Sequence, residues 1–351
     1  MSVGSRLRLV RESEGLSQKA FANLFGLNQA LFSKYETGAL EAPEAFVSQV
    51  AEKYGFLPSF FSSPEVDVAS GLIFHRKRAS LSARERMKVE AEGILRADDI
   101  AVAARKLRIK SDFPPAGITY VWAECNVASS PAEAAAWLRD IWDVPQGPIE
   151  DVCALFEKHG VFVLKYDFGT REIDAFLLPV GADIVCIALN SEFDNSPDRQ
   201  RHSLCHELGH ALLHRESFPG KECEMEADAF AAAFLAPEED FRRDINRQMT
   251  FTMLKGVKAK WKISMSSIVL QANRMGVMGD STYRRTLIWL SSIGCRKQEP
   301  LCGIVPEKPH AATATIKRYI GNDIQAIDDF GLSREKFFAR YPELAEKEAA
   351  V

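Results

Sequence analysis

Residues 206–210 read His-Glu-Leu-Gly-His, and the interpretation of the whole chain starts from this stretch. On an α-helix, residues four apart share a face, so His206 and His210 can bind one metal ion together. Glu207, beside the first histidine, can then reach a water molecule bound to that ion. The pattern is typical of the active site of a zinc hydrolase, and Zn²⁺ is the cofactor that we expect.

The residues before this motif predict that a rigid helix carries it. Residues 184–189 read Ile-Val-Cys-Ile-Ala-Leu, which is typical of a short buried strand. Ser196, Pro197 and Asp198 then supply turn and cap residues, so we expect the helix to run over about residues 199–214.

A catalytic zinc site usually has three protein ligands, so one more ligand must come from another part of the chain. Residues 223–235 carry an apolar stripe of Ala and Phe that predicts a second helix, which Pro237 ends. We assign Glu224 as the third ligand and Asp228 as the carboxylate that orients a ligand histidine. Glu226 is the competing ligand, but it lies about 200° around the helix from Glu224, so both cannot bind one ion. A solvated surface position is the alternative for either glutamate.

The chain from residue 199 to residue 237 contains RQRHSLCHELGHALLH followed by ECEMEADAFAAAFLAP. This run resembles the ImmA/IrrE family of metallopeptidases, and the resemblance extends over about residues 148–278. It implies a zinc-dependent endopeptidase that cleaves helix-turn-helix repressors and so switches genes on. It also implies that three residues bind the zinc and that a fourth is the catalytic base: His206, His210 and Glu224 as ligands, and Glu207 as the base.

The neighbours of the motif depart from the family pattern. Cys205 and His202 stand where family members often have Ala and an aromatic residue. A cysteine next to a ligand histidine points about 100° away from it on a helix, so we expect Cys205 to pack. His214 extends the face of the two histidines by one turn. We expect it to be a hydrogen-bonded structural residue, because a fourth protein ligand would leave no place for water.

Residues 5–56 carry four helical patterns in quick succession, with glycines in the breaks. The second and third, joined by a turn at Gly26 and Leu27, have the layout of a helix-turn-helix with residues 28–36 as the recognition helix. The four predicted helices are 5–11, 17–25, 28–35 and 43–54. We expect the small core to contain Leu16, Phe21, Leu24, Leu27, Phe32, Val47 and Val50.

Residues 15–38, GLSQKAFANLFGLNQALFSKYETG, resemble Xre-type repressor DNA-binding domains, and the likeness covers about fifty residues. The resemblance implies that double-stranded DNA is a partner, read by base contacts early in the recognition helix and held by phosphate contacts around it. Amides suit base reading because Asn and Gln can pair bidentately with adenine. The base-reading candidates are Asn28, Gln29, Ser33 and Lys34, and the phosphate candidates are Gln18 and Thr37.

Charge in this module is less typical of a DNA-binding surface. Basic and acidic residues are matched between residues 5 and 56, so the module lacks a strong basic footprint. A helix bundle that binds protein is therefore the alternative.

Positive charge appears directly after the module. Residues 75–78 read His-Arg-Lys-Arg, and Ser80 and Ser82 then lead into a long helical pattern over about residues 83–107. We expect one side of this helix to pack on the peptidase body or on a second copy, and the basic turn to add phosphate contacts. A homodimer would suit the arrangement, because helix-turn-helix modules gain affinity by occupying paired half-sites.

The composition is that of an ordinary globular protein. The chain has 351 residues, 46% of them hydrophobic, and a formal net charge of −4, which gives no global attraction to DNA. We find no membrane-spanning segment and no apolar signal region, so we expect a cytoplasmic protein that does not bind membranes. Seven cysteines without a C-x-x-C pair indicate reduced thiols.

We therefore predict an α+β fold, in which an all-α helix-turn-helix bundle precedes a zincin-like metallopeptidase domain with a small sheet and the HExxH helix. The predicted strands are 161–166, 175–178 and 184–189. Further predicted helices are 131–141, 149–159, 238–247, 250–261, 265–275, 322–330 and 333–341. The predicted divisions are a helix-turn-helix domain over 1–62, a basic helical linker over 63–115, the metallopeptidase domain over 116–280 and a C-terminal region without an assigned role over 281–351.

The sequence thus favours a DNA-binding transcriptional regulator fused to a zinc endopeptidase, whose protein substrate, on the family resemblance, is a helix-turn-helix repressor. Glu207 would take a proton from water and hand it to the leaving amine. The alternative is a transcription factor or antitoxin without proteolytic activity, whose peptidase-like domain senses a ligand or a partner. The intact histidines and carboxylates favour the enzyme. Candidates for stabilising the oxyanion are His159, Tyr166, His202 and His214.

Overall fold

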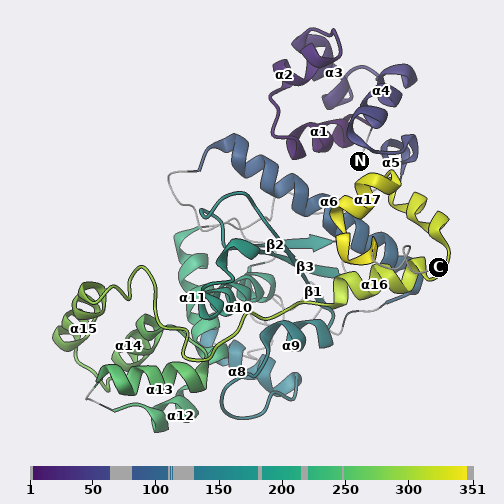
Figure 1. Cartoon of the computed structure of the whole chain (residues 1–351). Helices are drawn as coiled ribbons and strands as arrows, with labels where there is room; N and C mark the ends of the chain where they lie inside the picture. The colour runs from purple at the N-terminus through teal and green to yellow at the C-terminus, as the bar shows by residue number, and fades with distance from the viewer. Residues whose placement is uncertain are drawn as a thin grey trace.

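The computed structural model shows a mostly helical protein with one three-stranded sheet near its centre (Figure 1). The N-terminal helices and the helices of residues 238–292 lie at opposite ends of the molecule (Figure 1). The structure describes residues 3–63, 81–109, 111, 113, 130–180, 184–214, 220–246 and 249–345.

The N-terminal region folds into the predicted helix-turn-helix bundle. The hydroxyl of Ser17 accepts a hydrogen bond from the N–H of Ala20 at 3.1 Å, and Asn28 accepts one from the N–H of Leu31 at 2.8 Å, so both central helices begin at a capping residue. Gly38 ends the recognition helix with a φ of 73°, a left-handed conformation that suits glycine. The helices are α1 Val3–Ser13, α2 Gln18–Leu24, α3 Gln29–Thr37, α4 Glu44–Tyr54 and α5 Pro58–Ser62.

Aromatic side chains form the centre of this bundle. Phe21 and Phe32 are fully buried and stack with their ring centroids 4.8 Å apart. The prediction for Leu24 is wrong, since this residue is 52% exposed. Phe25 takes the inward position instead and packs edge-on against Phe46. The other predicted core residues are buried or pack against the buried cluster.

The sheet separates two hydrophobic cores. Its order is β1-β3-β2, with β1 parallel and β2 antiparallel to β3. Successive side chains of a strand point to opposite faces, so Val163 and Ile187 belong to one core while Leu164 and Ala188 belong to the other. The strands confirm the prediction to within two residues: β1 Val161–Tyr166, β2 Ala175–Val180 and β3 Ile184–Asn190.

The first core joins the sheet to the helices that carry the HExxH motif and the glutamates. Gly209 lets two of these helices approach closely, because a Cβ there would lie 3.1 Å from the ring of Phe230 and 3.2 Å from the Cα of Ala227. A larger residue would therefore push the second helix and its glutamates away from the histidines. The helices on this face are α8 Pro131–Ile141, α9 Val152–Lys158, α10 Pro197–Leu213 and α11 Lys221–Leu235. The short 3-10 helix η2, Ser191–Phe193, leads from β3 into α10.

The second core joins the opposite face of the sheet to the helix-turn-helix region through α6, Ala83–Leu107. A capping box between Ser82 and Glu85 starts this helix where the sequence predicts it. Gly93 brings α6 against the sheet, because a Cβ there would lie 2.7 Å from the ring of Phe176. One side of the predicted helix thus packs on the body of the protein.

The C-terminal helices return to α6 and close the second core. Arg340 and the hydroxyl of Tyr341 both donate to the carboxylate of Asp99, at 2.7 and 2.8 Å. From α1, Arg6 forms a buried ion pair with Asp98. Breaking either ion pair would leave a buried charge uncompensated, which is costly. The two pairs therefore stabilise the packing of α1 and of the C-terminal helices on α6. The C-terminal elements are α16 Ala311–Ile320, η4 Ile324–Phe330 and α17 Arg334–Arg340.

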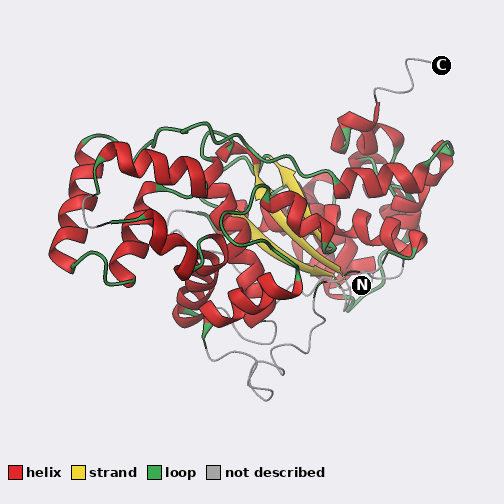
Figure 2. Cartoon of the chain, turned by 90° about the horizontal axis from the view of Figure 1, so that it is seen from below, coloured by secondary structure: helices red, strands yellow, loops and turns green. Residues whose placement is uncertain are grey.

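The helices after Pro237 form a lobe at the other end of the molecule. Helices α13 and α14 match the predicted stretches 250–261 and 265–275, and α12 is shorter than the predicted stretch 238–247. The sequence analysis did not predict α15 or α16. An irregular segment runs from this lobe back across the molecule to α16 (Figure 2). The elements of the lobe are α12 Glu238–Phe241, η3 Arg242–Asp244, α13 Phe251–Trp261, α14 Met265–Arg274 and α15 Asp280–Ser292.

Several expectations concern residues that the structure does not describe. The basic turn at 75–78 lies outside the described residues, as does most of the chain around the boundary predicted at residue 115. The predicted divisions stay predictions, although the second core runs across the one at residue 62. No helix in the described part of the chain is long and apolar enough to cross a membrane.

Candidate metal centre

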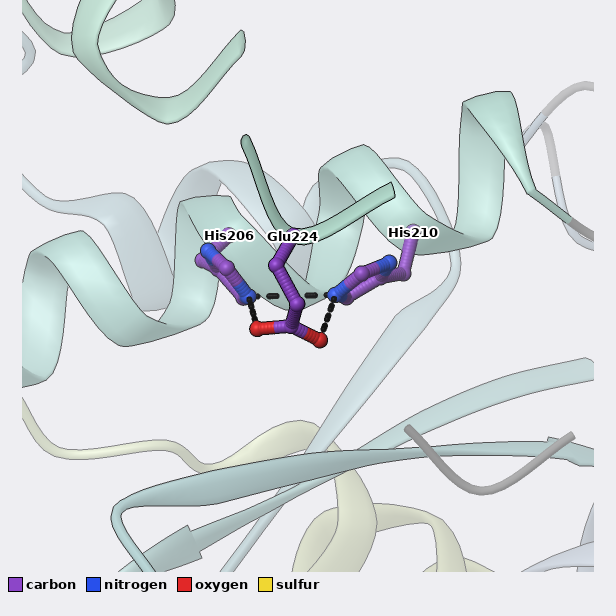
Figure 3. Close-up of side chains that lie close together, drawn as sticks. All are labelled: His206, His210 and Glu224. Carbon is purple, nitrogen blue, oxygen red and sulfur yellow. Dashed lines mark hydrogen bonds and ion pairs between the residues drawn. The ribbon is translucent and has the colours of Figure 1, made fainter. Parts of the chain in front are cut away.

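The structure brings together the three side chains that the sequence proposes as metal ligands (Figure 3). His206 and His210 project from one face of α10, and their Nε2 atoms lie 3.0 Å apart. Glu224 approaches from α11, with one carboxylate oxygen 3.5 Å from Nε2 of His206 and the other 3.4 Å from Nε2 of His210. The three donor groups therefore face one point between the two helices.

The spacing of these donor atoms fits a zinc ion. Zinc binds histidine nitrogen at about 2.0–2.1 Å in tetrahedral geometry, which places neighbouring donor atoms about 3.3 Å apart. The distances between the two nitrogens and the carboxylate oxygens, 3.0 to 3.5 Å, bracket that value. Two imidazoles and one carboxylate are also a ligand set of catalytic zinc sites, which leave one position for water.

Hydrogen bonds behind His206 fix which of its nitrogens faces this point. Its Nδ1–H donates at 2.9 Å to the carboxylate of Asp228, the residue proposed from the sequence to orient a ligand histidine. Since this bond keeps a proton on Nδ1, Nε2 is the nitrogen that can offer a lone pair to a metal.

His210 is oriented by a longer chain of groups. Its Nδ1 lies 3.0 Å from Nδ1 of His214, and Nε2–H of His214 donates to Glu226 at 2.7 Å. Burial lowers the pKa of His214, so its Nδ1 is an acceptor for His210, whose Nε2 then keeps its lone pair. His214 is thus a hydrogen-bonded structural residue, as expected. Glu226, the competing ligand, binds His214 and lies outside the group of donors.

Glu207 lies beside the histidines in a position that suits a general base. It is buried, the backbone N–H of Leu177 on β2 donates to its carboxylate, and its Oε2 has no hydrogen-bond partner among the described residues. Burial raises the pKa of Glu207 to about 8. A cavity of about 30 Å³ next to Glu207 and His206 has room for a water molecule that this oxygen could bind.

The pKa values of the three donor groups are those expected of a site that binds a cation. Burial raises the pKa of Glu224, but its contacts with the two histidines outweigh burial and lower the value to about 2. Burial lowers the pKa of His206, but the bonds to Asp228 and Glu224 raise it to about 9. Burial lowers the pKa of His210 to about 4. Without a metal the centre therefore holds one proton on His206, and a metal ion would replace it.

The four candidates for stabilising the oxyanion lie in different parts of the structure. Tyr166 lies in the second core, where its hydroxyl donates to the carbonyl of Val89, and His159 stacks on Trp142 in the first core. His214 lies behind His210, as described above. Of the four, His202 lines the cavities beside the donor group. Cys205 is fully buried in the first core, which agrees with a packing role.

Sequence reasoning missed Asp174, which lies next to the site. It lines the small cavity and accepts hydrogen bonds from Arg199 on the first turns of α10, at 2.5 and 2.7 Å. Nothing in its sequence neighbourhood marks it. Its contact with Arg199 spans β2, β3 and η2.

A second group of ligand-type side chains has a structural explanation. Asp151, Cys153 and Glu307 lie close together. Glu307 accepts hydrogen bonds from the N–H groups of Val152 and Cys153 at 3.0 and 2.9 Å, so it caps α9. Burial raises the pKa of the Cys153 thiol well above its usual range, which keeps it protonated and unsuited to a metal.

The base-reading candidates lie on the outer face of the recognition helix. Gln29 and Lys34 are exposed and Ser33 is half-buried. Asn28 uses its side-chain oxygen to cap α3, which leaves its amide hydrogens to contact a base.

The two phosphate candidates have partners within the protein. Gln18 donates from its amide to Glu36 at 2.6 Å, and the hydroxyl of Thr37 donates to the carbonyl of Ser33 at 2.9 Å. Gln18 keeps a second amide hydrogen for a phosphate. Glu36 also pairs with the buried Arg11, at 2.6 Å, so this network joins α1, α2 and α3.

Comparison with known families assigns both parts of the chain. Residues 2–59 match the family described as a helix-turn-helix domain, and residues 156–273 match the IrrE N-terminal-like domain, a peptidase family. A search of curated proteins finds no relative that matches the chain. The second match contains the three ligand-type residues and Glu207, and the first contains the recognition helix. The chain therefore combines an N-terminal helix-turn-helix DNA-binding domain with an IrrE N-terminal-like peptidase domain.

Proposed function

We propose that this protein is a DNA-binding regulator whose IrrE-like domain is a zinc-dependent endopeptidase. The observation that carries the proposal is the convergence of His206, His210 and Glu224 beside the buried carboxylate of Glu207. Such a set of groups is suited to hydrolysis of a peptide bond. A helix-turn-helix repressor is the proposed substrate, on the strength of the family resemblance, and cleaving it would switch its target genes on.

Each of these residues would have a separate role in hydrolysis. His206, His210 and Glu224 would hold the zinc, with Asp228 and the pair of His214 and Glu226 keeping the imidazoles in place. A bound zinc ion would supply Lewis acidity, which activates water and polarises the peptide carbonyl. Glu207 would accept the proton of that water on its free oxygen and deliver it to the leaving amine.

The raised pKa of Glu207 bears on this role. A general base works best when its pKa lies near the working pH, and burial moves this carboxyl to about 8. The Leu177 N–H binds this carboxylate, its Oε2 has no partner among the described residues, and Glu207 lines the small cavity where water fits.

The helix-turn-helix domain would bind double-stranded DNA through Asn28, Gln29, Ser33 and Lys34. This domain packs on α6 through the second core and the buried ion pair of Arg6 and Asp98, which connects it to the peptidase part. The peptidase would thus be kept at the operator where a repressor also binds. Two copies on paired half-sites would place two peptidase domains there.

The test compares the wild-type chain with Glu207→Gln, both loaded with zinc and incubated with helix-turn-helix repressors encoded beside its gene. Glu207→Gln keeps the size of the side chain but removes its basicity, so cleavage should slow by about 10²–10⁴-fold while zinc content and DNA binding stay the same. Glu222→Gln, at an exposed position on α11, is the matched control and should cleave normally. Wild-type protein should yield a discrete pair of fragments. Equal cleavage by Glu207→Gln, or no cleavage by the wild type, would contradict the proposal.

A further inference from the structure

A cavity of about 490 Å³ lies beside the candidate metal centre, between α10, α11 and the lobe of α13 to α15. It shares Asp174, His202 and Ser203 with the small cavity at Glu207, and Asp228 also lines it. The two cavities therefore adjoin. A peptide held with its scissile bond near Glu207 would continue into the larger one.

The interior of this cavity offers both apolar and polar contacts. Its volume lies within the range of about 300–1,000 Å³ that is typical of small-molecule binding sites. Apolar side chains from several elements provide a surface for a hydrophobic side chain, and serines of α14 provide hydroxyls. The apolar contributors are Leu235, Ile263, Leu270, Tyr283 and Leu287.

Most charged groups in the interior of the cavity are paired with one another. Arg199 pairs with Asp174 at 2.5 Å. The fully buried Lys258 donates to Asp198 at 2.9 Å and to Glu299 at 2.8 Å. One negative charge is left over, because Asp198 and Glu299 share the single cation Lys258, and it lies on carboxylates that are only 8% and 11% exposed.

Three cations at the rim remain. Arg274, Arg296 and Lys297 line the cavity, are exposed to solvent, and form no ion pair with a carboxylate of the described residues. Asp228, the one further carboxylate in the lining, is engaged by His206. The rim is therefore positive, so it favours a ligand with negative charge.

The loop that carries two of these cations is anchored at both ends. Cys295 is buried in the first core, and Glu299 accepts hydrogen bonds from Lys258 and from the N–H of Met265 at the start of α14. Arg296 and Lys297 are thus held over the cavity on a loop whose ends are fixed. Because the ends of the loop are anchored, less conformational freedom of its backbone is lost when a ligand binds.

We propose that this cavity is a substrate subsite, and that it selects a segment combining acidic side chains with an apolar one on one side of the scissile bond. The inference rests on the proposed peptidase function, because the cavity adjoins the place where the peptide bond would be cut. Acidic side chains would pair with the rim, and the apolar side chain would bind the interior.

Binding can be measured without relying on cleavage. The probes are two fluorescein-labelled dodecapeptides of Leu and Ser residues, one carrying Glu and the other Lys at the same positions. Fluorescence anisotropy is recorded with the full-length, zinc-loaded Glu207→Gln protein at low ionic strength. The Glu peptide should bind about tenfold more tightly than the Lys peptide, and salt should reduce the difference. In Arg296→Glu/Lys297→Glu that preference should disappear or reverse.

Two further variants make the result specific. Lys317→Glu/Arg318→Glu reverses two neighbouring exposed cations on α16, a helix that packs in the second core and contributes no residue to the cavity, and should keep the preference. Ser266→Trp, at an exposed position lining the cavity, should obstruct it and weaken binding of the Glu peptide.

Failure of the subsite is distinguishable from failure of the peptidase. The subsite proposal is overturned if neither peptide binds, if both bind equally, if the two double variants lose the same affinity, or if Ser266→Trp binds normally. Absence of cleavage by the wild-type protein would refute the peptidase function, but it would leave this binding preference measurable and intact.

Discussion

Replacing Asp228 by alanine should weaken zinc binding without removing any ligand. In the structure the Nδ1–H of His206 donates to this carboxylate at 2.9 Å, and the side chain of Asp228 is 29% exposed. A hydrogen bond to a charged group contributes about 1.5–3 kcal/mol. Because about 1.4 kcal/mol corresponds to a factor of ten, its loss should reduce zinc affinity about 10- to 100-fold.

The assay is a competition between the protein and a chelator of known zinc affinity, at fixed pH. Asp228→Asn keeps a side-chain oxygen that can accept from His206, so its loss of affinity should be smaller than that of Asp228→Ala. Glu222→Ala removes an exposed carboxylate from the same helix and should bind zinc like the wild type. If Asp228→Ala and Glu222→Ala bind zinc equally well, the argument that Asp228 orients His206 is refuted.

Three further predictions concern different parts of the molecule. Zinc affinity should rise about tenfold per pH unit from pH 7 to pH 9 and then level off, because zinc binding must displace one proton from His206, whose pKa is about 9. A flat profile in the chelator titration would contradict this. Gln29→Ala should weaken binding to a specific operator by about 1–3 kcal/mol and barely change binding to random duplex, as measured by gel shift; equal losses would mean that α3 does not read bases. Arg340→Ala should lower the free energy of unfolding by about 3–5 kcal/mol, since it leaves the buried Asp99 without its counter-charge. Denaturant unfolding within about 1 kcal/mol of wild type would show that the pair is not needed.

Local sequence patterns predicted the elements that carry the site. The four-residue spacing of His206 and His210 places both imidazoles on one helix face, and Ser196 to Asp198 mark where that helix starts. The same holds for the helix-turn-helix, where Ser17, Asn28 and Gly38 bound the helices. These signals are local, since caps and periodicity depend on neighbours within one or two turns.

Contacts between distant segments could not be predicted in this way. Sequence spacing alone could not decide whether Glu224 or Glu226 is the third ligand. The pairing of Glu226 with His214 depends on how α11 packs on α10. Asp174 and Glu299 reach the site or the adjoining cavity from segments whose sequence gives no signal. The docking of α1 on α6 through Arg6 depends on a partner far along the chain. Such pairings are decided by tertiary packing and not by local propensity.

The central claim is that His206, His210 and Glu224 hold one zinc ion, and metal content tests it most directly. Native mass spectrometry and elemental analysis should find one zinc per chain in the gently purified wild-type protein and in Glu226→Ala, and none in Glu224→Ala. Zinc retained by Glu224→Ala, zinc lost from Glu226→Ala, or a wild-type protein that takes up no zinc would contradict the claim.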